Sequence, residues 1–264
     1  MRKRSPLSWL WVALVVIFTL APLGIMLMMS FSSSEFVRFP PPGFSLRWYR
    51  AYFASADWID ATLRSLWIGA SVAGLSVLLG VPASLGIQRL GPVAGNLVLG
   101  LTTLPIILPP VVIAIAMYMA FSSLGLAGSV FGILFGHLTL GLPFVVLTTL
   151  AALNKMDPQY PMAARSLGSG KLRVFFTVTL PIIRPGILSG ALFAFLTSFD
   201  ELMIALFVGS SETRTLPRRM WEGVKSEFDP TISAASTFVV LTILALVAIV
   251  ILSRRILRPG TRKT

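Results

Sequence analysis

Long stretches without a charged residue divide the chain, and each is long enough to cross a bilayer as a helix. About 20 helical residues cross the roughly 30 Å of hydrocarbon in a membrane. The uncharged stretches cover residues 5–34, 65–88, 90–154 and 230–253. The third holds 65 residues, and the segment SSLGLAG at 122–128 predicts a turn between two passes. These four stretches therefore predict five membrane-spanning helices.

A sixth span is predicted at about 185–209, where the sequence is hydrophobic except for Asp200 and Glu201. An ionised carboxylate near the centre of a spanning helix costs about 2.5–3.5 kcal/mol on insertion scales. A water-lined path for cations would offset that cost. So would a position near the outer end of the span, facing water or paired with an arginine. Adjacent residues of a helix point about 100° apart, so we expect only one of the two acids to line a path.

The composition agrees with an all-α integral membrane protein of six transmembrane helices. Apolar residues make up 55% of the chain and charged residues 12%, and the mean hydropathy is +0.85, which is outside the range of soluble globular proteins. The N-terminal Met-Arg-Lys-Arg and the apolar run behind it could instead form a cleaved secretory signal. That run is too long and lacks a clear small-x-small cleavage site, so we expect a retained helix.

Basic residues are distributed unevenly between the two sides of the predicted membrane. On the side that carries both termini, the loops hold fourteen Lys and Arg residues and one acid; the opposite side holds eight basic and seven acidic residues. Since Lys and Arg mark cytoplasmic loops, both termini are predicted to be cytoplasmic. The net charge of +12 follows from this topology and does not indicate a nucleic-acid partner. The chain has no cysteine, so it has neither a disulfide nor a thiolate metal site, and we expect no metal site.

The loops on the two sides differ in kind. The outer loops, about 31–62 and 210–231, are rich in aromatic residues and mixed in charge. They suit an amphipathic segment on the membrane surface, a docking face for a partner, or a belt of interfacial aromatic residues. The inner loop contains Asp157-Pro158, a helix-start signal, and Gly168, a helix-end signal, and a second short helix is expected from Lys171 to about Leu180, before Pro181. This loop is therefore predicted to be a helix-turn-helix.

The segment Gly-Ser-Gly-Lys at 168–171 looks like the end of a phosphate-binding loop. That motif needs Gly-x-x-x-x-Gly-Lys-Ser/Thr after a strand, because backbone amides surround the phosphates and a hydroxyl reaches the magnesium ion. When the motif is aligned on Gly170 and Lys171, Arg165 occupies the first glycine position and Leu172 the hydroxyl position. The chain is therefore not expected to bind ATP, and we expect it to hold no cofactor of its own.

The inner loop instead resembles the cytoplasmic signature of permease subunits in binding-protein-dependent ABC importers. That signature is Glu-Ala-Ala, three residues, Gly, nine residues, Ile, one residue and Leu-Pro. It is matched at the correct spacing, with Met162 replacing the glutamate and Val178 the isoleucine, by Met162, Ala163, Ala164, Gly168, Val178, Leu180 and Pro181. The resemblance implies that this loop, residues 154–184, seats on a cytoplasmic ATPase subunit.

A second segment is similar to the spermidine/putrescine branch of these permeases. SFDELMIALFVGSSETRTLPRRMW at 198–221 carries its Ser-Phe-Asp-acid and Thr-Leu-Pro pattern, and LPFVVLTTLAAL at 142–153 adds to the likeness. The resemblance implies the type I ABC importer permease fold. It also implies a substrate path at Ser198, Phe199, Asp200 and Glu201, with Asp200 as the preferred residue. Other members of this branch carry iron, aminophosphonates or opines, so these solutes stay open.

The resemblance further implies an organisation and a set of partners. Residues 1–61 would form a first helix and an external loop, residues 62–253 a core of five helices, and residues 254–264 a basic cytoplasmic tail. The partners would be two cytoplasmic ABC ATPase subunits that use ATP and Mg²⁺, a second permease subunit, identical or related, and an extracytoplasmic solute-binding protein. The chain would be a multi-pass protein of the cytoplasmic (inner) membrane.

Other residues of the apolar stretches are predicted to serve packing. Gly128, Gly132 and Gly136 form a stripe that lets helices approach closely, and His137 is expected to make a hydrogen bond between helices. Prolines are expected to interrupt the third and fourth spans, where freed carbonyls face protein or a water-filled cavity; they are Pro105, Pro109, Pro110 and Pro143.

Two other function classes fit the sequence less well. An enzyme would need a nucleophile motif, a paired acid and base or a metal cluster, and none of these patterns is evident. A self-sufficient channel or secondary carrier remains an alternative, but such carriers usually show internal repeats and several ionisable residues within the membrane. The sequence therefore predicts a non-catalytic permease subunit that moves a small cationic solute, with a polyamine as the first choice.

Overall fold

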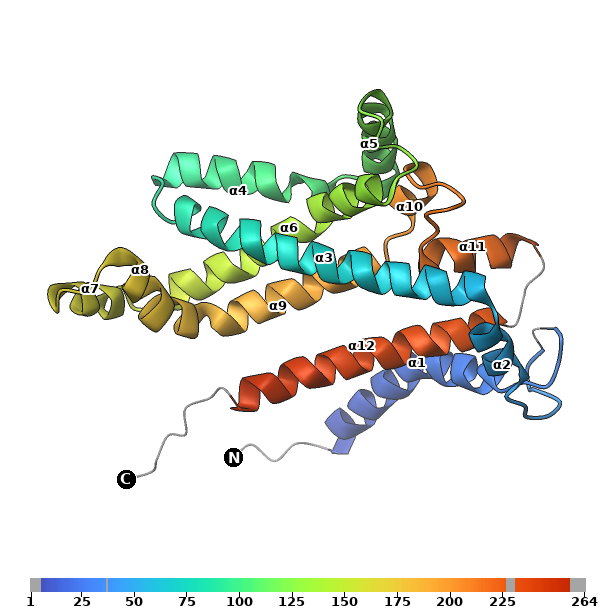
Figure 1. Ribbon diagram of the computed structural model, residues 1–264. Helices are drawn as coiled ribbons and strands as arrows, with labels where there is room; N and C mark the ends of the chain where they lie inside the picture. The colour runs from blue at the N-terminus through green and yellow to red at the C-terminus, as the bar shows by residue number, and fades with distance from the viewer. Residues whose placement is uncertain (1–5, 37, 227–230, 257–264) are drawn as a thin grey trace. The chain divides into compact units, whose positions relative to one another are not determined.

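The structure of the chain is a computed structural model that describes residues 6–36, 38–226 and 231–256 (Figure 1). Within these ranges the regular structure is helical, apart from one isolated antiparallel bridge between Ser32 and Phe44. The helices are α1 (Pro6–Ser30), α2 (Arg47–Ala54), α3 (Ala56–Ile87), α4 (Pro92–Ile107), α5 (Pro110–Ser123), α6 (Val130–Lys155), α7 (Gln159–Ser166), α8 (Lys171–Val174), the π-helical turn η1 (Phe175–Thr179), α9 (Leu180–Phe199), α10 (Met203–Phe207), α11 (Leu216–Ser226) and α12 (Thr231–Ile256). The chain divides into two units, Met1–Asp60 with Arg219–Leu244, and Ala61–Arg218 with Ala245–Thr264.

The first unit is held together by an aromatic cluster around Tyr52 of α2. Tyr52 is buried, and its ring lies 5.8 Å from that of Trp58 at the start of α3 and 5.9 Å from that of Phe238 in α12. The guanidinium of Arg219 lies 4.6 Å above the Trp58 ring, a cation–π contact. The Tyr49 hydroxyl is 2.8 Å from Ser30 Oγ at the end of α1. Contacts made by aromatic side chains therefore join α2 to the three longer helices of this unit.

The second unit is built around α6, which runs beside α9 (Figure 1). Among the helices that the structure describes, these two form the pair with the most extensive contact. Small residues permit the close approach: a Cβ on Gly186 would lie 2.7 Å from the Thr148 carbonyl oxygen. α6 also contacts α3, where Ser84 Oγ donates to the Val146 carbonyl at 3.2 Å. Lipid provides no hydrophobic force between helices, so van der Waals packing and hydrogen bonds of this kind hold them together.

Among the described residues, four helices are long and apolar enough to cross a membrane: the segments Trp9–Ser30, Ala56–Ile87, Val130–Lys155 and Lys171–Phe199. The pair α4 and α5 qualifies jointly but is bent by 102° at its break, as in a broken span or a re-entrant loop. The described apolar part of α12, Thr231–Ala245, is shorter. The helices thus give four spans, or five if the bent pair counts as one, and the number of six stays a prediction.

The break between α4 and α5 confirms the expected interruption of the third span at Pro109 and Pro110. It falls at Leu108 and Pro109, because proline lacks an amide hydrogen and restricts the residue before it. The predicted turn at 122–128 is confirmed, since α5 ends at Ser123 and α6 begins at Val130. Pro105 and Pro143, however, lie inside helices that continue past them. The expectation that they interrupt their spans was therefore wrong.

The span predicted at about 185–209 was wrong at both ends. The helical path begins at Lys171 and passes through η1 into α9, so Pro181 does not separate two helices. The missing amide of Pro181 falls just after the π-helical turn, where the hydrogen-bond ladder already changes its spacing. At the other end α9 stops at Phe199 instead of continuing to residue 209, and the short helix α10 follows. Asp200 and Glu201 therefore lie at a break and not within a helix.

Candidate functional site

The inner loop forms the helix-turn-helix that its sequence predicts. Asp157 Oδ1 accepts a hydrogen bond of 2.9 Å from the Gln159 amide and so starts α7. The turn after α7 contains Gly168 at φ +83°, and the Gly168 amide donates to the Arg165 carbonyl at 2.9 Å. A Cβ at Gly168 would meet no described atom within 4 Å. Glycine is therefore needed at position 168 because of its positive φ, and not because a side chain would clash with a neighbouring atom.

This loop exposes apolar side chains on its helices and its turn. Leu167 is 87% exposed and Leu172 76% exposed, and Tyr160, Met162 and Phe176 are also exposed. Exposed apolar groups of this size beside basic residues are typical of a surface that meets another protein. Sequence reasoning did not select Tyr160, Leu167, Leu172 or Phe176; large apolar residues outside a predicted span were the available signal.

The seven residues of the loop signature fall into two groups. Met162 and Ala163 are exposed on α7, Ala164 is partly buried there, and Gly168 occupies the turn. Val178 lies in η1, while Leu180 packs against the core of the second unit, which includes Ile183 and Leu153. Pro181 stands in the first turn of α9. The first group is thus available to a partner, whereas Leu180 anchors the loop to α9.

The break between α9 and α10 is organised by the carboxylate of Glu201. Its Oε1 accepts a 2.9 Å hydrogen bond from the Met203 amide and its Oε2 a 2.8 Å bond from the Ile204 amide. These two amides have no partner inside the helix, so the carboxylate caps the start of α10. Glu201 is only 8% exposed. The Glu201 side chain is therefore buried, with both of its oxygens bonded to the backbone of α10.

His137 of α6 approaches the same carboxylate from the facing helix. Its Nδ1 is 2.9 Å from Ser198 Oγ, which confirms the expected hydrogen bond between helices. Its Nε2 is 3.5 Å from Glu201 Oε2 and makes no hydrogen bond to it. His137 is 1% exposed. A buried cluster of three polar side chains therefore joins α6 to the break.

Asp200 differs from its neighbour in being exposed. It lies at the end of α9 and lines an open hollow of about 550 Å³, whose other lining residues are Pro110, Leu140, Leu196, Thr197, Glu201, Leu202 and Met203. Of the four predicted path residues, Asp200 and Glu201 thus reach the hollow. Ser198 and Phe199 are buried, and the Phe199 ring stacks on that of Phe195 with centroids 5.4 Å apart.

The three glycines predicted as a packing stripe have two different roles. A Cβ on Gly136 would lie 2.6 Å from Ile204 Cγ2, and one on Gly132 would clash first with the Leu126 carbonyl oxygen of the preceding turn and would lie 3.1 Å from Val208 Cγ1. Both glycines therefore let α10 and the residue after it approach α6 closely. Gly128 lies before α6, at φ +80°, and its amide donates to the Val208 carbonyl at 2.7 Å. Its assignment to the helix was wrong, because it is a turn residue.

The segment after α10 is tied to the rest of the second unit by hydrogen bonds. Ser210 Oγ donates to the Gly128 carbonyl at 2.9 Å, and the Leu216 amide donates to Ser65 Oγ of α3 at 2.8 Å. Arg218 Nη1 donates to the Ala205 carbonyl within α10 at 2.9 Å. The short helix is therefore held at its start by Glu201 and at its middle residue, Ala205, by Arg218.

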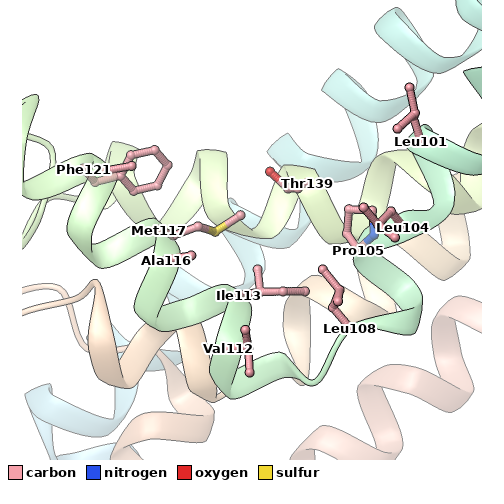
Figure 2. A pocket seen from close by; sticks show the side chains of 11 residues that line it. Leu101, Leu104, Pro105, Leu108, Val112, Ile113, Ala116, Met117, Phe121 and Thr139 are labelled. Carbon is pink, nitrogen blue, oxygen red and sulfur yellow. The ribbon is translucent and has the colours of Figure 1, made fainter.

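A second hollow, of about 450 Å³, lies at the bend between α4 and α5 and is closed on one side by α6 (Figure 2). Side chains such as Leu104, Ile113, Met117 and Phe121 line it, and Thr139 is the polar one among its eleven lining residues. It offers no charged group to a cation, in contrast to the hollow beside Asp200. Nor does the described part of the chain contain a group of three His, Cys, Asp or Glu residues that could hold a metal ion.

The chain is similar in sequence to several known proteins, and each similarity covers most of its length. It is 33% identical over 245 residues to the putrescine transport system permease protein PotI of Escherichia coli K12, covering 89% of this chain and 86% of PotI. It is 29% identical to the spermidine/putrescine transport system permease protein PotC of the same strain, over 91% and 90% of the two chains. It is also 33% identical to the molybdenum transport system permease protein ModB of Mycobacterium bovis, over 76% and 81%.

Solved structures show the same fold. A chain of a bacterial ABC transporter that imports the acidic polysaccharide alginate superposes with a TM-score of 0.72 at 13% identity, covering 97% of this chain and 99% of that one. A bacterial alginate ABC transporter in complex with its alginate-bound periplasmic protein gives a TM-score of 0.67. Residues 74–263 match the family model described as binding-protein-dependent transport system inner membrane component. The chain therefore belongs to this family, as a non-catalytic permease subunit of an ABC importer in the inner membrane.

Proposed function

We propose that the chain carries a small cationic solute of the polyamine class, such as putrescine or spermidine, toward the cytoplasm. The observation that carries this proposal is the exposed carboxylate of Asp200 beside an open hollow at a helix break. A protonated amine can pair transiently with such a carboxylate, whereas an oxyanion is repelled by it. The names of PotI and PotC support a polyamine.

The inner loop is proposed to couple the chain to the ATPase subunits of the importer. Its exposed apolar residues on α7 and in the turn after it, together with Met162 and Ala163, offer a docking surface outside the spanning helices. Movement of the loop passes directly into α9, because α8, η1 and α9 form one helical path that ends beside Asp200. In this proposal two ATPase subunits bind ATP and Mg²⁺, and this chain holds no cofactor.

Several further features of the proposal rest on the sequence. The excess of basic residues in the inner loops supports cytoplasmic termini. A second permease subunit, identical or related, completes the path, and a solute-binding protein docks on the outer loops. The proposed organisation is a first helix and external loop at 1–61, a core at 62–253 and a basic tail at 254–264, of which residues 257–264 lie outside the described part of the chain.

The test is an uptake assay with the complete importer in liposomes, together with its own binding protein. Labelled putrescine, spermidine, ferric iron and molybdate are offered separately, with and without ATP inside. ATP-dependent accumulation of putrescine or spermidine is expected. Accumulation of iron or molybdate in place of both polyamines would overturn the proposed solute class, because the carboxylate at 200 would then serve another purpose.

A further inference from the structure

Glu201 has a different environment from Asp200, although the two residues are adjacent. Both Glu201 oxygens already accept backbone hydrogen bonds, and the side chain is largely buried. A carboxylate in this state is a poor partner for a passing solute, because a solute would have to compete with two amides for it. Glu201 therefore serves to shape the break between α9 and α10, and its position depends on the side chains that face it.

The facing side chains supply a consistent set of donors and acceptors. A His137 that carries its proton on Nε2 accepts at Nδ1 from the Ser198 hydroxyl at 2.9 Å, and its Nε2 lies 3.5 Å from Glu201 Oε2, close to it but without a hydrogen bond. His137 thus lies between Ser198, in the last turn of α9, and the carboxylate that starts α10.

Steric contact adds a second constraint at the same place. Gly136 precedes His137, and the space where its Cβ would stand is occupied by Ile204, which is buried in the first turn of α10. The side chain of His137 and the backbone of Gly136 thus fix both the cap and the first turn of α10 from one point on α6. Asp200 lies between α9 and this cap, so its position depends on both.

We propose that His137 is a positioning residue for the translocation path: through Glu201 it holds the α9–α10 break in one geometry and so places Asp200 in the hollow. His137 itself need not touch the solute. This inference rests on the proposed function only in so far as Asp200 contacts the solute, and the geometry of the break can be tested without any solute.

The first test uses the absence of cysteine from the chain. In the complete importer, Leu202→Cys places a reporter thiol in the hollow just after Glu201, and Thr197→Cys places a control thiol in the last turn of α9. Adding His137→Ala should raise the rate at which a charged thiol reagent modifies the reporter by about tenfold, since local opening becomes easier when a buried partner is lost. The modification rate of the control thiol should change by less than about twofold, because α9 stays packed on α6.

Equal modification rates of the reporter thiol with and without His137 would overturn the inference, and so would equal acceleration of both thiols, which reports general loosening. The conservative variant His137→Gln offers one acceptor and one donor and should restore most of the slow rate. If His137→Gln accelerates modification as much as His137→Ala, the linking role is refuted.

The second test is a double-mutant cycle on putrescine uptake by the complete importer. His137→Ala and Glu201→Gln should each raise KM about fivefold, the factor expected from the loss of one interaction, with a smaller effect on the maximal rate. The double variant should resemble either single variant, because His137 acts through Glu201. Multiplied effects in the double variant would contradict the inference. Failure of wild-type putrescine uptake would contradict the proposed function alone, since the thiol-modification test does not depend on a solute.

Discussion

Gly190 of α9 lies directly against Val145 of α6: a Cβ built on Gly190 would stand 2.6 Å from the Val145 Cα. This contact is part of the α6–α9 pairing on which the second unit is built. We therefore expect Gly190→Val to force the two helices apart and to destabilise the protein by about 1–3 kcal/mol or more. Thermal unfolding of the purified importer in detergent, followed by the loss of monodisperse protein, measures this effect.

Gly86 supplies the matched control for this substitution. It lies in α3, and a Cβ there would meet no described atom within 4 Å. Gly86→Val should therefore leave the unfolding temperature close to that of the wild type. A similar loss of stability in both variants would show that the cost arises from valine in a helix and not from the α6–α9 contact.

Local signals in the sequence were sufficient to predict α7 and the turn after it, but not that the second helix of the inner loop continues into α9. The start of α7 depends on Asp157 and its end on Gly168, and each acts on atoms within a few residues of itself. The break at Pro109 likewise follows from the chemistry of proline. The size of the bend, 102° between α4 and α5, was not predictable, because a proline ends a helix without setting the direction of the next one.

The break between α9 and α10, which carries Asp200 and Glu201, was not predicted from the sequence. The apolar residues after Glu201 favoured a continuous span, because hydropathy does not distinguish a spanning helix from a short buried one. The cap itself was a local signal that could have been found, since Glu201 bonds to amides two and three residues ahead. The approach of His137 could not, because 64 residues separate it from Glu201, and only the packing of α6 on α9 and α10 brings them together.

Gly168→Val tests the coupling role of the inner loop. Valine at φ +83° costs about 1–2 kcal/mol or more, so the turn between α7 and α8 should change shape. ATP-driven uptake should be abolished and ATP hydrolysis uncoupled from the binding protein, while membrane insertion stays normal; Ala164→Trp should act in the same way by obstructing the surface of α7. Uptake and ATPase assays on the same liposomes measure the coupling.

Gly170→Ala is the control for the turn. Gly170 has φ −66°, which alanine adopts without strain, and a Cβ there would meet no described atom within 4 Å. This variant should transport normally. Normal coupled uptake by Gly168→Val would show that the turn geometry is not needed for coupling.

Asp200→Asn tests the carboxylate in the hollow. The change removes the charge with little change in shape, so putrescine uptake should show a KM increase of about tenfold, the loss expected for one charge-assisted contact of about 1.5 kcal/mol. Asp200→Glu, which keeps the charge, should retain most of the uptake. The importer should assemble normally in both cases, as judged by co-purification of the ATPase. Unchanged kinetics in Asp200→Asn would remove this residue from the path.

The exposed apolar surface of the inner loop gives a last prediction, on residues that the signature does not include. Leu167 is 87% exposed at the end of α7, and a protein partner would cover it. Leu167→Glu should weaken the association with the ATPase by about 2 kcal/mol, since a charge then replaces a buried apolar side chain in the interface. Co-purification through a tag on this chain, followed by quantification of the ATPase, measures the loss. Ser166→Glu adds the same charge one residue earlier without removing an apolar group and should have a smaller effect, so equal losses in the two variants would assign the effect to charge alone and not to burial of Leu167.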